Sequence, residues 1–255
     1  MQPAPGKQSG FTLVEMLAVM GIMLILLALL GPALKTLKGA GDINSASYDI
    51  SGLIQGARSY AMANHTYTWV GFYEENQGTQ TPTAATPAYP GKGQLVMTVV
   101  CSQDGTTSCQ NPAATASNPI PMTASLISQI VKLTKIENIH VTDIGAPAGS
   151  TNINTLDGRP GLAYTYGSPN DHFNRISSDS SDITTFPFVA QGYTFYKTLQ
   201  FDPTGEVTVN GNYGLRPLVE IGLQPTNGTL PDANSKNLVA IQVTGIAGNV
   251  TIYRR

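Results

Sequence analysis

The sequence predicts an α+β fold in which one long N-terminal helix packs on a C-terminal antiparallel β-sheet domain. An apolar segment near the N-terminus, and helical spacing of apolar residues beyond it, predict the helix. Short β-branched and aromatic runs predict the sheet, because turn residues separate them, including many of the 26 glycines and 17 prolines. These patterns divide the 255 residues into a polar start (1–10), an apolar helix (11–31), its amphipathic continuation (32–63) and a β-rich domain (64–255).

Residues 11–30 are apolar at 17 of 20 positions. A helix of this length spans about 30 Å, the thickness of the hydrocarbon layer of a bilayer. A secretory signal has a shorter apolar region of about 7–15 residues and carries no carboxylate, and 20 residues apolar on every face argue against a buried helix of a soluble domain. We therefore expect this segment to span a membrane, in contact with membrane lipid.

Glu15 interrupts the apolar segment, and a carboxylate at the centre of a membrane costs about 2.5–3.5 kcal/mol. Its position alone leaves two interpretations open. Glu15 either reaches the interface from near the helix end, at little cost, or it has a functional role.

Helical spacing continues beyond the apolar segment, although each glycine there weakens the helix by about 1 kcal/mol relative to alanine. We expect one apolar stripe of this continuation to pack on the β-domain. The stripe consists of Ile50, Leu53, Ile54, Ala57, Tyr60 and Ala61.

The rest of the chain reads as strands and exposed loops. We expect hairpins at Pro203-Thr204-Gly205 and at residues 245–249, and a helix over residues 125–136, where apolar residues recur at helical spacing. Polar, turn-rich loops are expected at 76–93, 102–123 and 170–185. The predicted strands are 67–73, 94–101, 161–166, 193–201, 206–209, 218–223, 238–243 and 250–253.

Composition argues against several functional classes. Only 12% of residues are charged and the formal net charge is −2, so no basic field attracts nucleic acid. Two cysteines and three widely spaced histidines argue against a disulfide-dense scaffold, a zinc site and a catalytic triad. The run of serines and aspartates at 177–182 lacks the glycine and terminal glutamate of a calcium-binding EF-hand loop. We expect no enzymatic activity, cofactor, metal or nucleic-acid partner.

Cys101 and Cys109 lie close in sequence, at the end of a predicted strand and in the following loop. If the domain is exported, a disulfide between them would contribute about 2–3 kcal/mol. We favour this bond over the alternative of two unpaired thiols.

The residues Gly10-Phe11-Thr12-Leu13-Val14-Glu15, which follow a short polar leader and precede the apolar segment, resemble the type IV prepilins and pseudopilins. In that family a prepilin peptidase cuts the leader after the glycine on the cytoplasmic side and N-methylates the new terminus, usually phenylalanine. The resemblance implies cleavage between Gly10 and Phe11, an assembly role for Glu15 at the fifth mature position, and a helix kink at Pro32.

The resemblance also implies the location and the partners of the chain. The protein would cross the bacterial inner membrane once, with its C-terminal domain in the periplasm, and enter a filament on assembly. Its partners would be the prepilin peptidase, other pilin or pseudopilin subunits and an inner-membrane assembly platform.

A second, shorter resemblance points to the GspH/FimT-type minor pseudopilins and pilins. Their helix carries an Ala-Arg-Ser run, as at Ala57-Arg58-Ser59, and their C-terminal domain has a Phe-x-Pro-x-Gly hairpin, as at residues 201–205. The end of this chain, Val239–Tyr253 with Gly248 in the turn, is similar to their terminal hairpin. The two resemblances thus imply a structural subunit, a minor pilin or pseudopilin, of a type IV pilus or type II secretion pseudopilus. The rival interpretation is a membrane-anchored exoplasmic binding or adhesion module.

Overall fold

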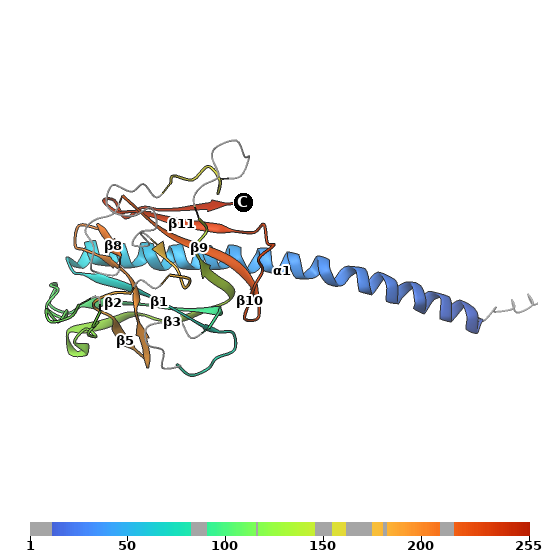
Figure 1. The fold of residues 1–255 in the computed structure, drawn as a ribbon, viewed down its shortest axis with the longest axis horizontal. Helices are drawn as coiled ribbons and strands as arrows, with labels where there is room; N and C mark the ends of the chain where they lie inside the picture. Colours follow the sequence, from blue (N-terminus) through green and yellow to red (C-terminus); the bar gives the residue numbers. More distant parts are fainter. Residues whose placement is uncertain are drawn as a thin grey trace, which may run out of the picture. The chain divides into compact units, whose positions relative to one another are not determined.

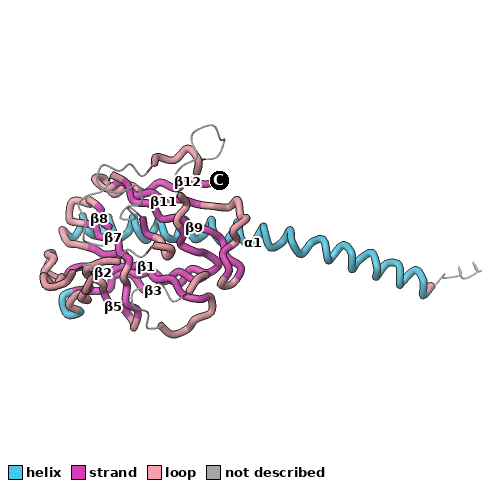
Figure 2. The backbone as a smooth tube through the Cα atoms, viewed as in Figure 1, coloured by secondary structure: helices cyan, strands magenta, loops and turns pink. Residues whose placement is uncertain are grey.

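A computed structural model describes residues 12–82, 91–115, 117–145, 155–161, 175–180, 183–209 and 217–255, with only the backbone described at 29–40. The chain divides into two compact units, Met1–Lys38 and Gly39–Arg255. One helix, α1 (Leu13–Asn64), runs through both, and strands dominate the second unit (Figures 1 and 2).

The second unit is built on one largely antiparallel sheet, ten-stranded over the described residues. Its strands follow the order β12-β11-β9-β3-β2-β1-β7-β8, while β4 and β10 pair with β9. This arrangement confirms the predicted α+β class. The strands are β1 (Thr68–Asn76), β2 (Gly93–Ser102), β3 (Ile127–Thr142), β4 (Arg175–Ile176), β7 (Lys197–Phe201), β8 (Val207–Val209), β9 (Leu218–Asn227), β10 (Leu230–Pro231), β11 (Val239–Thr244) and β12 (Val250–Arg254).

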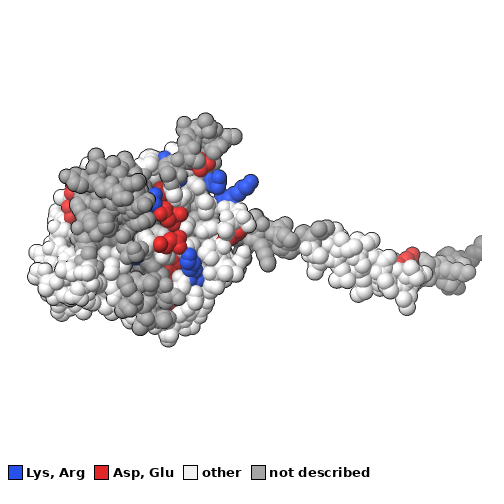
Figure 3. Space-filling model, viewed as in Figure 1, with Lys and Arg blue, Asp and Glu red and all other residues white. Residues whose placement is uncertain are grey.

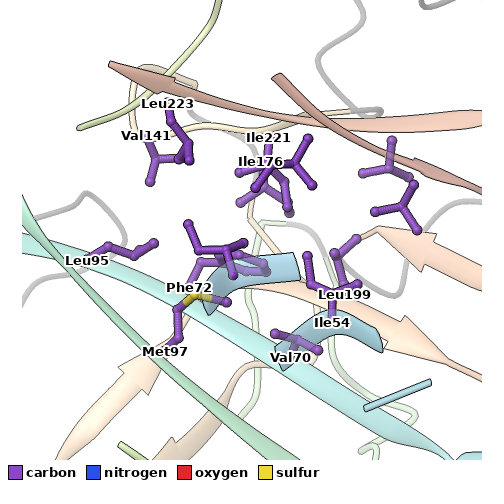
Figure 4. Packing of buried hydrophobic residues seen from close by; sticks show 14 of the residues in the cluster. Ile54, Val70, Phe72, Leu95, Met97, Val141, Ile176, Leu199, Ile221 and Leu223 are labelled. Atoms are coloured by element: carbon purple, nitrogen blue, oxygen red, sulfur yellow. The ribbon is translucent and has the colours of Figure 1, made fainter. Parts of the chain in front are cut away.

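One face of this sheet packs on the second half of α1, and the largest apolar cluster lies between them (Figure 4). From the predicted stripe, Ile50, Ile54, Ala57 and Ala61 are buried, whereas Leu53 is half-buried and Tyr60 is 37% exposed. Removing the Ile50 and Ile54 side chains from water contributes about 1.5–3 kcal/mol each. The helix is therefore part of the core of this unit.

The opposite face of the sheet is covered by a small hairpin, β5 (Phe188–Ala190) and β6 (Tyr193–Phe195). Phe188 and Phe195 are buried and stack on each other with ring centroids 4.9 Å apart. They lie over Gly71 of β1, where an added Cβ would come within 2.6 Å of both rings. The missing side chain at Gly71 thus makes room for the hairpin.

The helix expected over residues 125–136 is wrong, since this segment forms the 3-10 turn η1 (Ala124–Leu126) and most of β3. In a helix, Leu126, Ile130 and Leu133 would share one face. In the structure Leu126 and Leu133 pack under the β5–β6 hairpin, while Ile130 packs in the cluster against α1. The β2–β3 register has irregularities, which interrupt the strict alternation of side chains between the two faces of β3. The apolar residues of this strand therefore recur at a spacing that is typical of a helix.

The other predicted elements hold with changes at their ends. The hairpins β7–β8 and β11–β12 are confirmed. The strand expected at 193–201 is interrupted at Tyr196, so that β6 and β7 belong to different sheets. The expected loop at 170–185 contains β4, with Ile176 buried. Of the strand expected at 161–166, only Gly161 is described, outside any strand.

Candidate functional site

The first half of α1 exposes its apolar side chains. Between Leu13 and Leu27 every large apolar residue is at least half exposed within this unit, with Leu13 at 81%. Exposed apolar surface on this scale marks a contact with lipid or with other proteins. Within the described residues, no helix has the length and apolar character needed to cross a membrane.

Thr12 and Glu15 form a reciprocal cap at the start of α1. The Thr12 backbone N–H and hydroxyl each donate to Glu15 Oε2 at 2.8 Å, and the Glu15 N–H donates to Thr12 Oγ1 at 3.3 Å. This is a capping box, which satisfies backbone donors that have no partner at a helix N-terminus. The Thr-x-x-Glu spacing was a readable signal for it, and the sequence interpretation did not use it.

The other residues of the predicted processing site are described only in part. Gly10 and Phe11 lie outside the described residues. Pro32 lies within α1, where only the backbone is described.

At the far end of α1, the three short GspH/FimT-like motifs meet. Gly205 of the β7–β8 turn and Gly248 of the β11–β12 turn lie against Arg58: an added Cβ would stand 3.1 Å from Arg58 Nε at Gly205 and 2.6 Å from Arg58 Cδ at Gly248. Arg58 Nε is buried and has no hydrogen-bond partner among the described residues. Both turns thus pack against the Arg58 side chain of the Ala-Arg-Ser run.

The predicted disulfide is not formed, because the structure holds both cysteines as free, buried thiols. Cys101 Sγ lies 4.0 Å from the Tyr60 hydroxyl, on the helix side of the sheet. Cys109 Sγ lies 4.0 Å from Met122 Sδ, in the cluster on the opposite face. Burial raises the pKa of the Cys109 thiol to about 11, which keeps it protonated and unreactive.

A buried charge network that the sequence did not reveal joins β1, β3 and the segment after β4. Glu74 Oε1 lies 2.9 Å from His140 Nδ1, and both side chains are at most 2% exposed. On the other side of the ring, His140 Nε2 lies 3.2 Å from Asp179 Oδ2. Ser178 Oγ and the Val141 N–H also donate to Glu74 Oε2. The network connects residues 177–180 to β1 and β3, two strands that are far apart in sequence.

Burial alone would lower the pKa of His140, but its hydrogen bonds to Asp179 and Glu74, and their charges, raise it to about 9. The hydrogen bond from His140 holds the pKa of Asp179 well below its usual range. Lys92 Nζ donates to Asp179 Oδ1 at 2.9 Å and lies 3.0 Å from His140 Nε2. With His140 protonated, the two cations, Lys92 and His140, balance the two carboxylates, Glu74 and Asp179, so the cluster has no net charge. We call this cluster the clasp. Figure 3 shows acidic and basic residues side by side on one face of the molecule that otherwise carries few charges.

The arrangement offers no metal centre within the described part of the chain, where no group of three candidate ligands was found. Glu74 and Asp179 approach opposite ring nitrogens of His140, so they cannot converge on one ion. Of the histidines, His65 lies at the turn after α1, and residue 172 lies outside the described residues.

Residues 5–31 match a family model, the prokaryotic N-terminal methylation motif. Comparisons with curated proteins and with solved structures gave no match. The fold is an α+β fold with a long N-terminal helix, and the motif covers the start of that helix. The motif supports a protein of the type IV prepilin or pseudopilin type, because it is the motif that prepilin peptidase processes and through which pilin subunits assemble.

Proposed function

We propose that the protein is a structural subunit, and not an enzyme, of a type IV pilus or a type II secretion pseudopilus. Prepilin peptidase cuts between Gly10 and Phe11 and methylates Phe11. Residues 11–31 then hold the chain in the bacterial inner membrane with the globular unit in the periplasm. The observation that carries the proposal is the methylation motif at residues 5–31, which includes the start of α1 and its exposed apolar side chains.

Within that class, a GspH/FimT-type minor subunit is the subtype we propose. Its support is that Arg58, Gly205 and Gly248, which carry the three short motifs, lie together in space. Their contact in space is what we expect if the three motifs are one shared feature of the subclass fold.

The deciding experiment is mass spectrometry of the mature N-terminus, combined with fractionation of sheared filaments. A chain that begins at N-methylated Phe11 and is found in the filament fraction supports the proposal. An uncleaved chain dispersed in the membrane would instead favour a membrane-anchored binding or adhesion module.

A further inference from the structure

A small hollow of about 210 Å³ lies between α1 and the end of the β11–β12 hairpin that is away from its turn. On one side it is lined by α1, and on the other by residues around the start of β11 and the end of β12. Pockets for drug-sized ligands have volumes of roughly 300–1,000 Å³. This hollow is smaller, so it suits an ion or a single charged headgroup.

The polar residues that line the hollow are Asn44, Asn237, Arg254 and Arg255, and no carboxylate is among them. A guanidinium has five N–H donors and no acceptor, and each asparagine amide adds two donors. Neither arginine forms an ion pair within the part of the chain that the structure describes. The hollow therefore offers positive charge and hydrogen-bond donors from both of its sides.

Arg254 has a fixed position beside the helix without any ligand. Its Nη2 donates to Ser47 Oγ at 3.0 Å, and its Cζ lies 4.7 Å from the centroid of the Tyr48 ring. Its backbone N–H and carbonyl both bond to the Thr155 hydroxyl, at 2.7 and 2.9 Å. A side chain that is already ordered loses little conformational entropy on binding, which favours affinity.

The surroundings strengthen the demand for an anion. Arg254 and Arg255 are neighbours in sequence and line the same hollow, so their two positive charges repel each other. The apolar part of the lining includes Ile43 and Val239, each only 2% exposed. Electrostatic interactions are stronger beside such a buried apolar surface than in open water. A bound anion would offset the repulsion between the arginines.

We propose that this hollow binds a phosphate-type oxyanion, either free phosphate or the headgroup of an anionic lipid. Guanidinium groups bind phosphate through paired N–H···O bonds. The donors come from α1 on one side and from the strand ends on the other. A tetrahedral phosphate presents oxygens to several sides, whereas a planar carboxylate accepts in one plane. The site is additional to the proposed function and independent of it.

The test measures the thermal unfolding midpoint of the full chain in an uncharged detergent, followed by the fluorescence of Trp69. Inorganic phosphate is added at low millimolar concentration, with sodium chloride holding the ionic strength constant. A ligand that binds only the folded chain raises the midpoint. We expect a saturable rise with phosphate and a much smaller one with acetate. The low concentration matters, because concentrated phosphate stabilises any fold by exclusion from its surface.

Three variants locate the response. Arg255→Gln should raise the half-saturating phosphate concentration about tenfold, because it removes charge-assisted hydrogen bonds. Lys132→Gln is the matched control, since it removes the same charge from an exposed lysine that does not line the hollow. Asn237→Asp places a carboxylate beside the arginines with almost no change of shape. It should abolish the response and raise the midpoint measured without phosphate.

A lipid experiment distinguishes the two sources of phosphate. The same chains are placed in nanodiscs of zwitterionic phosphatidylcholine, with or without anionic phosphatidylglycerol. A response to inorganic phosphate that Asn237→Asp abolishes supports a site for the free anion. A response only to phosphatidylglycerol, abolished in the same variant, supports a headgroup site.

Three results would overturn the proposal: no response to either probe, an equal response to acetate, or a response that Arg255→Gln and Asn237→Asp retain. None of them affects cleavage at Phe11 or entry into filaments, so the proposed function is tested separately.

Discussion

Val207 donates its backbone N–H to the carbonyl of Gly245 at 2.7 Å, and this bond joins opposite ends of the sheet. Val207 begins β8, the strand at one end of the order, and Gly245 follows β11, next to the other end. The sheet must therefore curl around the second half of α1 until its ends meet above Arg58. The bond thus brings the β7–β8 and β11–β12 hairpins together at one end of the helix.

Gly248→Ala should destabilise the globular unit by about 1–3 kcal/mol more than Gly228→Ala. Both glycines have the same left-handed conformation, with φ of 60° and 63°, so both variants carry the same backbone strain. An alanine Cβ at position 248 would stand 2.5 Å from the Gly205 carbonyl oxygen, whereas at position 228 the nearest atom is 3.9 Å away.

Denaturant unfolding of the full chain in detergent, followed by the fluorescence of the single, buried tryptophan, Trp69, measures this difference. Equal losses of stability in the two variants would show that the contact between the turns contributes nothing.

The clasp between Glu74, His140 and Asp179 should make stability depend on pH above neutrality. The pKa of His140 rises from 6.5 in the unfolded chain to about 9 in the fold. The folded state therefore binds a proton more tightly, and its stabilisation is complete below about pH 6.5 and is lost as the pH rises through about 9.

The difference in unfolding midpoint between the wild type and His140→Gln, measured from pH 6 to pH 10, isolates this effect. Glutamine keeps polar atoms in the site but does not titrate, so the difference should shrink across that range. His65→Gln, at an exposed histidine, is the matched control and should behave like the wild type. A difference that stays constant with pH would contradict a protonated His140.

Local sequence patterns were sufficient for much of this fold. The helix to residue 63 follows from apolar spacing, and α1 ends at Asn64. The β7–β8 hairpin follows from turn chemistry, since Asp202 Oδ1 accepts bonds from the Thr204 and Glu206 N–H groups and stabilises the turn. In each case the residues that decide the conformation lie within a few positions of one another.

The features that were missed depend on contacts between distant residues. The β3 segment has helical spacing, but pairing with β2 and β9 on its two sides determines its conformation. Glu74 and His140 are 66 positions apart, and nothing near either residue indicates the other. Cys101 and Cys109 are close in sequence, but the sheet separates them because their side chains lie on opposite faces.

Gly10→Val should block processing and leave the full-length precursor in the membrane. Glycine has no side chain and fits a closely packed peptidase subsite, which a branched side chain would not enter. Gly6→Val, in the same leader, is the matched control and should be cleaved normally. Intact mass of the purified protein gives the result, and normal cleavage of the Gly10 variant would place the cut elsewhere.

Glu15→Gln should be inserted and processed normally but should fail to enter filaments. Cleavage creates a cationic amine at Phe11, four residues before the Glu15 carboxylate. Each charge is costly alone in an apolar layer, and pairing between neighbouring subunits relieves both costs. The structure adds that Glu15 also caps α1, so an alanine variant would confuse loss of charge with loss of the cap. Glutamine can still fill the capping box while removing the charge.

Thr12→Ala is the complementary variant for the Glu15 experiment, because it removes the hydroxyl of the cap, at a cost of about 1 kcal/mol, and keeps the carboxylate. Filament fractions, normalised to mature protein in the membrane, compare the two variants with the wild type. If charge pairing drives assembly, Thr12→Ala enters filaments and Glu15→Gln does not. If both fail equally, the helix cap is the determinant. If Glu15→Gln assembles as well as the wild type, the carboxylate only reaches the interface, as the simpler interpretation of its position near the helix end requires.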